Sequence, residues 1–165
     1  MTGQPALPDG LRAGTDSDSA DVIALIGAAF AEYPGCVLDL PGIDAWMRAP
    51  GAAYEGTGGQ FWVLPGAAGL RACVGYRPVA PDRVELKSLY VAVSARRQGL
   101  GRRLVALVES AARDLGATTV QLWSDSRFLD AHRLYESLGY RRGTRTRRLH
   151  DPSDTTEYFF DGDLS

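Results

Sequence analysis

The most constraining feature of this 165-residue chain is a strand that passes through a glycine-containing loop directly into a helix. Residues 83–93 read as a strand, and residues 99–115 place Leu and Val at the spacing of an amphipathic helix. The N–H groups of a helix's first turn lack intrahelical partners and attract anions, and glycines such as Gly99 and Gly101 let a phosphate approach the backbone. The run therefore predicts an anion-binding turn in a fold of strands and helices.

The flanking sequence predicts further strands and helices around this turn. Helices are expected at residues 17–33, 43–48 and 131–138, the second bounded by Pro41-Gly42 and Pro50-Gly51. Strands are expected at residues 60–64, 70–79, 118–123, 140–149 and 156–161. If the strand over residues 83–93 is regular, one of its faces carries Glu85, Lys87, Leu89, Val91 and Val93. The predicted fold class is α/β in the mixed, α+β sense, with a central sheet flanked by helices.

Length and composition fit a single globular domain over residues 1–165, with residues 1–9 as a loose lead-in. The two cysteines, Cys36 and Cys73, lie far apart without a nearby histidine pair, which disfavours a zinc knuckle, an iron–sulfur site and a disulfide scaffold. The chain has no run of about 18 apolar residues and no secretory signal. These features favour a cytoplasmic protein that does not insert into membranes.

The formal net charge of −2 hides an uneven distribution along the chain. Residues 94–148 hold twelve Arg against five acidic residues, or +7, which favours an anionic partner. The negative total argues against nucleic acid as that partner, so a nucleic-acid-binding domain is the weakest hypothesis. The basic residues are seventeen Arg and one Lys, a bias that genome composition also explains.

Three glycine motifs can be compared with the predicted turn. A P-loop needs GxxxxGK[ST], and the only Lys of this chain is Lys87. A dinucleotide-binding GxGxxG motif fails because Leu104 stands in place of the third glycine. The pattern [QR]-x-x-G-x-[GA] does match, at residues 96–101 with the sequence RRQGLG. In this respect the chain resembles the GNAT superfamily of N-acetyltransferases, whose acyl-CoA-binding signature has this form.

Two neighbouring segments extend the resemblance to roughly residues 10–162. Residues 85–93, ELKSLYVAV, look like the family's fourth strand, and residues 131–140, AHRLYESLGY, are similar to its A-x-x-L-Y-E-x-L-G-F/Y helix and turn. The resemblance implies a mostly antiparallel, splayed sheet, acetyl-CoA as cosubstrate and no metal. Many members have Asn where this chain has Phe128, so we expect different cofactor contacts at the start of that helix.

The resemblance also assigns residues to acetyl-CoA. The pantetheine arm is expected in the wedge between the fourth and fifth strands, against the backbone of Val91, Ala92 and Val93. The pyrophosphate is expected at the turn, on Arg96, Arg97, Gln98, Gly99, Leu100, Gly101 and Arg102. The basic stretch of residues 94–148 is then explained as a complement to the anionic cofactor.

Proton transfer is assigned to two residues in the same way. Tyr135 matches the family's general acid, and Glu85 matches the strand carboxylate that accepts the amine's proton in several members. Simpler roles remain open, because Tyr135 also falls on an apolar helix stripe and Glu85 can pair with Lys87 on one strand face. Direct transfer in a ternary complex needs no protein nucleophile, so Cys36 and Cys73 need not be catalytic.

The sequence thus predicts an N-acetyltransferase acting on a primary amine of a small molecule, amino acid or peptide, and leaves the acceptor open. One strand is crowded by Arg141, Arg142, Arg145, Arg147 and Arg148. If these arginines face the acceptor, they favour an amine that also bears a carboxylate or phosphate. If they lie on a solvated edge strand, their charges only oppose aggregation. Cationic acceptors would instead be favoured by Glu32, Asp39 and Glu55.

The alternative function is a catalytically weak acyl-CoA sensor or interaction module. The sequence leaves open whether the protein forms a homodimer.

Overall fold

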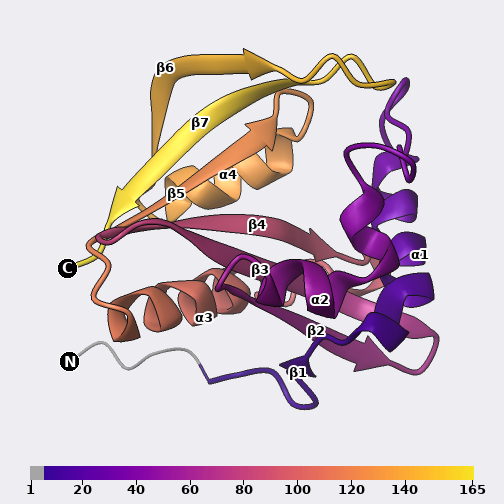
Figure 1. Ribbon diagram of the computed structural model, residues 1–165, viewed down its shortest axis with the longest axis horizontal. Helices are drawn as coiled ribbons and strands as arrows, with labels where there is room; N and C mark the ends of the chain where they lie inside the picture. Colours follow the sequence, from indigo (N-terminus) through magenta and orange to yellow (C-terminus); the bar gives the residue numbers. More distant parts are fainter. Residues whose placement is uncertain (1–5) are drawn as a thin grey trace.

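In residues 6–165, the part of the chain that the computed structural model describes, seven strands form one sheet in the order β1-β2-β3-β4-β5-β7-β6 (Figure 1). The strands are β1 (Arg12–Ala13), β2 (Gln60–Gly66), β3 (Gly69–Ala80), β4 (Arg83–Val91), β5 (Thr119–Asp125), β6 (Arg141–Arg148) and β7 (Thr156–Asp163). Neighbouring strands are antiparallel except β4 and β5, which run parallel. The predicted mixed, mostly antiparallel sheet is confirmed.

Helices cover both faces of the sheet. They are α1 (Ser19–Phe30), α2 (Pro50–Glu55), α3 (Leu100–Asp114) and α4 (Leu129–Ser137), with the short 3₁₀ turns η1 (Asp16–Asp18), η2 (Ala45–Arg48) and η3 (Val93–Ala95). α1, α2 and η2 pack on one face, in a core that includes Ile26 and Phe61. α3 and α4 pack on the other face, in a core that includes Leu104 and Phe160. The central sheet flanked by helices is therefore confirmed as well.

β4 and β5 pair at one end only. Their register runs from Arg83 opposite Thr119 to Glu85 opposite Gln121. Beyond this point β4 and β5 follow diverging paths, with β5 rising away from β4 (Figure 1). The splayed sheet that the resemblance implies is confirmed, and the facing edges of the two strands keep backbone groups that no sheet partner uses.

A β-bulge in β4 changes which side chains share a face. Between the pairs Cys73–Tyr90 and Gly75–Lys87, one β3 residue opposes two β4 residues, and Ser88 takes a left-handed backbone with φ 57°. Before the bulge the even-numbered residues of β4 enter the core beneath α3; after it the odd-numbered residues do so. The predicted single face of residues 85, 87, 89, 91 and 93 is therefore wrong, because the extra residue reverses the alternation. The last of these, Val93, lies beyond the strand in η3.

Most predicted helices are confirmed, with one omission. α1 and α3 lie within residues 17–33 and 99–115, α4 overlaps 131–138, and η2 covers the second half of 43–48. Gly99 and Gly116 bound α3 with φ of 76° and 82°. The expected end of the 43–48 helix before Pro50-Gly51 is confirmed, since η2 ends at Arg48, but the sequence did not predict α2, which begins at Pro50. Proline is favoured at the first position of a helix, where its missing N–H costs nothing.

The ends of the chain agree in part with expectation. Residues 1–5 of the predicted lead-in lie outside the described residues, and residues 6–9 contain neither helix nor strand. β6 and β7 form the predicted antiparallel hairpin at the sheet edge. In the described part of the chain, no helix combines the length and apolar character that crossing a membrane requires.

α2 positions Tyr54 against the bulged part of the sheet, and this contact gives a first prediction. Tyr54 packs on Gly75, where a Cβ atom would overlap the Tyr54 ring. Gly75→Ala should therefore lower the free energy of unfolding by about 1–3 kcal/mol through overpacking. Gly56→Ala is the matched control, because a Cβ there meets its nearest atom at 3.4 Å. Denaturant unfolding of both variants checks this, and equal stabilities would contradict it.

Candidate active site

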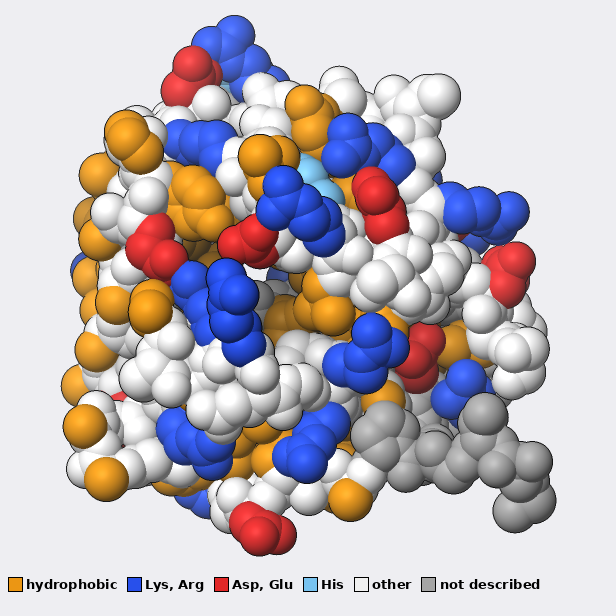
Figure 2. All heavy atoms as spheres, turned by 180° about the vertical axis from the view of Figure 1, so that it is seen from behind, with side chains coloured by type: hydrophobic (Ala, Val, Ile, Leu, Met, Phe, Trp, Pro, Cys, Tyr) orange, Lys and Arg blue, Asp and Glu red, His pale blue; other side chains and the backbone are white. Residues whose placement is uncertain are grey.

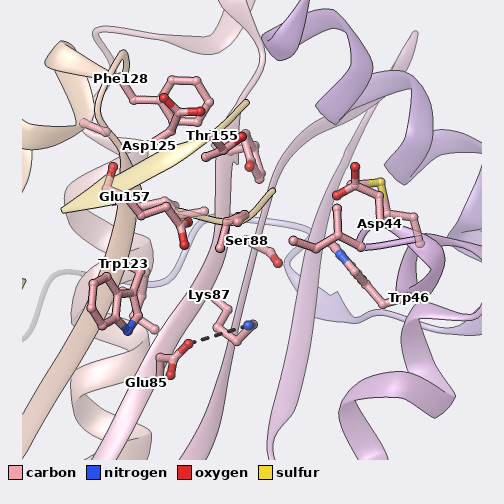
Figure 3. A pocket seen from close by; sticks show the side chains of 18 of the residues that line it. Asp44, Trp46, Glu85, Lys87, Ser88, Trp123, Asp125, Phe128, Thr155 and Glu157 are labelled. Atoms are coloured by element: carbon pink, nitrogen blue, oxygen red, sulfur yellow. Dashed lines mark ion pairs between the residues drawn. The ribbon is translucent and has the colours of Figure 1, made fainter. Parts of the chain in front are cut away.

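A cavity of about 380 Å³ opens where β4 and β5 separate. Its walls come from α1, η2, α2, α4 and strands β3, β4, β5, β6 and β7. Five carboxylates and three basic side chains line it: Asp44, Glu85, Asp125, Asp151, Glu157, Arg77, Lys87 and Arg147. In Figure 3, Glu85 and Trp123 lie together at one end, Ser88 lies between them and the far wall, and Asp44 and Trp46 lie across from them.

Glu85 lies in this cavity as a buried carboxylate, 3% exposed. Oε1 lies 3.5 Å from Nζ of Lys87, and Oε2 lies 3.4 Å from Nη2 of Arg77. Nε2 of Gln121 donates to Oε2 at 3.4 Å, so the last β4–β5 pair fixes the carboxylate. The predicted ion pair with Lys87 is present (Figure 3), and it leaves Glu85 on the cavity wall, so the two roles considered for Glu85 are compatible.

Tyr135 comes from α4 and reaches the cavity from the opposite side of the wedge. Its side chain is 5% exposed and packs on Tyr140 and Phe160. Burial raises the pKa of Tyr135 far above its ordinary value, so the phenol stays protonated at neutral pH. Tyr135 is thus both a core residue and a cavity residue. A buried, protonated phenol at the wedge can donate a proton to a leaving group there.

Ion pairs and hydrogen bonds hold the part of the cavity wall where β5 leads into α4. Arg127 donates to both oxygens of Asp125, at 2.9 and 2.7 Å, and Nε2 of His132 donates to the Asp125 carbonyl at 2.9 Å. Burial lowers the pKa of His132 below its ordinary value, which agrees with Nδ1 accepting from Arg142 at 3.4 Å. Phe128, in the position of the usual Asn, contacts Tyr33, with ring centroids 4.8 Å apart and the ring planes tilted by 45°. At this position Phe128 offers an aromatic contact, whereas an Asn side chain would offer hydrogen bonds.

The predicted anion-binding turn is formed at the start of α3. The first helical hydrogen bond runs from the N–H of Arg103 to the Gly99 carbonyl, 3.1 Å, which leaves the N–H groups of Leu100, Gly101 and Arg102 without intrahelical partners. The side chains of Arg97, Gln98 and Arg102 are exposed around it. A Cβ on Gly101 would come within 2.9 Å of Leu134 in α4, so this glycine also permits close helix packing.

Figure 2 shows Lys and Arg side chains spread over much of the face opposite to that of Figure 1.

Arg96 is engaged away from the turn. Its guanidinium binds both oxygens of Glu32 at 2.7 Å, and its Nε donates to the Val91 carbonyl at 3.0 Å. The N–H of Ala92 donates to the Arg71 carbonyl at 2.8 Å, and Val93 is 65% exposed. The backbone expected to meet pantetheine therefore lies next to the turn, with one carbonyl covered by Arg96.

Several cavity residues have no signal in the sequence. Ser88 bonds the Tyr54 hydroxyl at 2.7 Å, and Trp123 lies on the cavity floor next to Glu85. The acidic candidates Glu32, Asp39 and Glu55 do not line the cavity; Asp44, Asp125 and Asp151 do. Elements far apart in the chain bring these side chains together, so no local spacing could have indicated them.

The two cysteines are buried and unpaired. Burial raises the pKa of the Cys73 thiol to about 12 and raises that of Cys36, which lines the cavity. A protonated thiol is a poor nucleophile. Among the residues that the structure describes, no three His, Cys, Asp or Glu side chains are grouped as a metal site.

Comparison with known proteins agrees with this architecture. Residues 28–140 match the Acetyltransferase (GNAT) family. This chain therefore belongs to the GNAT family of acetyltransferases. Human N-acetyltransferase 8 is 34% identical over 90 residues, a match that spans 52% of this chain and 40% of the human protein.

Solved structures share the whole fold at low sequence identity. A GNAT-family acetyltransferase from Staphylococcus aureus aligns with a TM-score of 0.78 at 18% identity, covering 94% of this chain and 98% of that one. A putative acetyltransferase from Salmonella typhimurium, solved with its cofactor acetyl-CoA, aligns with a TM-score of 0.67 at 18% identity, covering 94% and 93%. The GNAT-like fold predicted from the sequence is confirmed.

The lowered pKa of buried His132 predicts how stability depends on pH. Between that pKa and about 6.5, the unfolded chain binds more protons than the folded protein, so stability falls as pH falls through this range. His132→Gln keeps an N–H donor for the Asp125 carbonyl and should flatten the dependence. Denaturant unfolding at about pH 7, 6 and 5 measures it. The exposed His150, changed to Asn, is the control, and an unaltered slope in His132→Gln would contradict the prediction.

Proposed function

We propose that this protein transfers the acetyl group of acetyl-CoA directly to a primary amine of a small molecule, amino acid or peptide in a ternary complex. One observation carries the proposal: the opening between β4 and β5 places buried Tyr135 and buried Glu85 in a single cavity. The anion-binding turn at the start of α3 follows directly from the end of β4. Family membership and the acetyl-CoA complex of the Salmonella relative support the same cosubstrate.

The residues present fit acetyl-CoA. The free N–H groups at the start of α3 and the exposed Arg97 and Arg102 suit a pyrophosphate, and the β5-facing edge of β4 has backbone groups without sheet partners. We assign the pantetheine arm to Val91, Ala92 and Val93, and the pyrophosphate to residues 96–102. When bound, acetyl-CoA supplies an acetyl thioester that an amine can attack.

The chain's own residues then orient the amine and move two protons. Glu85 accepts the proton of the attacking amine, directly or through water, while Arg77 and Lys87 hold the carboxylate in place. Tyr135 donates its phenolic proton to the departing thiolate. Positioning both partners in one cavity supplies much of the rate, because it removes the entropic cost of their encounter.

The role of Tyr135 is tested by removing its hydroxyl. Tyr135→Phe should lower kcat on the order of 10²-fold through the loss of general acid catalysis, with acetyl-CoA affinity unchanged. Tyr140→Phe is the matched control, because the Tyr140 hydroxyl bonds Glu109 at 3.3 Å and lies outside the cavity. CoA release across a panel of amines gives the rate, and calorimetry gives the affinity.

Two results would count against this function. A Tyr135→Phe rate equal to wild type would overturn the general-acid assignment. Tight acetyl-CoA binding without turnover on any amine would favour the acyl-CoA sensor.

The ion pair of Arg96 with Glu32 gives a second test of the cofactor site. Glu32→Gln removes a carboxylate beside the turn and frees the Arg96 guanidinium for phosphate. Acetyl-CoA should then bind roughly two- to five-fold more tightly, the range expected for a partly exposed ion pair. The exposed Glu55, changed to Gln, is the control, and weaker binding by Glu32→Gln would show that the ion pair supports the site.

A further inference from the structure

Trp123 lines the cavity next to Glu85 (Figure 3), and four basic side chains contact one or the other of these two residues. Two come from β6: the guanidinium carbons of Arg147 and Arg145 lie 4.4 and 5.8 Å from the Trp123 ring centroid. The other two, Arg77 from β3 and Lys87 from β4, line the same cavity and contact Glu85. Arg145 is exposed and lies beside the cavity, outside the set of residues that line it. We name Arg77, Lys87 and Arg147, together with the adjacent Arg145, the cationic end of the cavity.

Carboxylates balance this charge only in part. Arg147 pairs with Glu157 at 2.7 Å, whereas Arg77 and Lys87 share the single carboxylate of Glu85. Within the described residues, Arg145 has no carboxylate partner, and its guanidinium carbon lies 3.9 Å from the centroid of the Phe159 ring. Four basic groups therefore face two carboxylates, which leaves an excess of two positive charges at the cationic end.

The other arginines of β6 show that Arg145 is a special case. Arg141 pairs with Asp163, Arg148 pairs with Asp154, and Arg142 turns to α4, where it meets Glu136. The guanidinium carbon of Arg145 instead lies over the Phe159 ring, and the described residues give this arginine no carboxylate partner. A guanidinium held by an aromatic ring alone has N–H donors left for a carboxylate or phosphate.

Arg77 is a second basic group of the cationic end that has too few partners. Nε of Arg77 is buried and, in the described part of the chain, has no hydrogen-bond partner. The nearest acceptor for this guanidinium is Glu85, at 3.4 Å from Nη2, a long hydrogen bond. Arg77 is therefore incompletely satisfied, as expected for a group that awaits an anionic partner.

The acidic side chains across the cavity have structural partners. Asp44 accepts from the N–H of Asp39 at 2.8 Å. Asp151 accepts from the N–H and the hydroxyl of Thr155, both at 2.8 Å. These carboxylates stabilise the loops that carry them, so they are explained without a cationic ligand.

We propose that the acceptor is an amine that also carries an anionic oxygen group, a carboxylate or a phosphate, bound at the cationic end. This rests on the proposed acetyl transfer and specifies its substrate class. Arg145 is the specificity-determining residue, Arg77 and Arg147 border the anion, and the amine of the same molecule lies toward Glu85. The anion binds by charge-assisted hydrogen bonds, the strongest type available to an arginine.

Paired amines that differ only in the anion test the proposal. Phenylalanine is compared with 2-phenylethylamine for carboxylate, O-phosphoethanolamine with ethanolamine for phosphate, and spermidine represents cations. Binding to the protein with CoA is measured by calorimetry, and CoA release from acetyl-CoA gives kcat and KM. We expect the anionic member of at least one pair to bind roughly ten-fold more tightly or better, the gain of one charge-assisted hydrogen bond.

The variant Arg145→Met keeps the apolar contact with Phe159 and removes the charge. It should raise KM for the acceptor that carries the anionic group roughly ten-fold, leave kcat unchanged, and leave KM for the partner without that group unchanged. Arg148→Met is the matched control, since Arg148 lies on the same strand and pairs with Asp154. A purely structural role for Arg145 would change kcat and both KM values together.

The outcomes separate this inference from acetyl transfer itself. Turnover in which 2-phenylethylamine, ethanolamine or spermidine matches or exceeds the amines that carry an anionic group overturns the inference and keeps the function. Tighter binding of anionic amines without turnover supports the inference and overturns the function. Binding of no carboxylate or phosphate amine overturns the inference, as does an Arg145→Met variant that behaves like Arg148→Met.

Discussion

The early end of the β4–β5 ladder is the constraint on which the site depends. A continuous parallel pair would use the backbone groups of both strands and bring their side chains together across the seam. Here pairing stops after Glu85 and Gln121, and the bulge at Ser88 bends β4 away. The result is a wedge with free backbone groups on its edges and a cavity within it. The glycine turn at the start of α3 follows from the same strand, so one irregularity brings the site we propose for the cofactor next to the cavity.

Within that wedge, burial and neighbouring charges act differently on Tyr135 and Glu85. Burial keeps Tyr135 protonated, and burial also removes Glu85 from water while two cations hold its carboxylate. Burial of a carboxylate strengthens such electrostatic contacts, because the local dielectric is lower than in water. The basic groups beside Trp123 and Glu85 are the basis on which we propose an acceptor that carries an anionic group.

Prediction from sequence succeeded where the pattern is local. The apolar spacing of α3, the glycines at its ends and the RRQGLG motif sufficed to predict the turn, because helix periodicity and helix ends depend on neighbouring residues. It failed at the β4 faces, because no residue type marks a bulge unambiguously and one inserted residue reverses the alternation. It also missed α2, because Pro50 fits a helix start as well as a helix boundary.

The sequence by itself determined the fold family, the anion-binding turn and the identity of Tyr135 and Glu85 as candidates, since each depends on contiguous residues. Only the tertiary structure decided that Arg96 meets Glu32, 64 residues away, and that Arg145 and Arg147 lie on Trp123. It also showed that the acidic candidates Glu32, Asp39 and Glu55 lie outside the cavity, whereas Asp44, Asp125 and Asp151 line it. The physical reason is that side-chain pairing follows distance in space, which strand register and the splay of the sheet set.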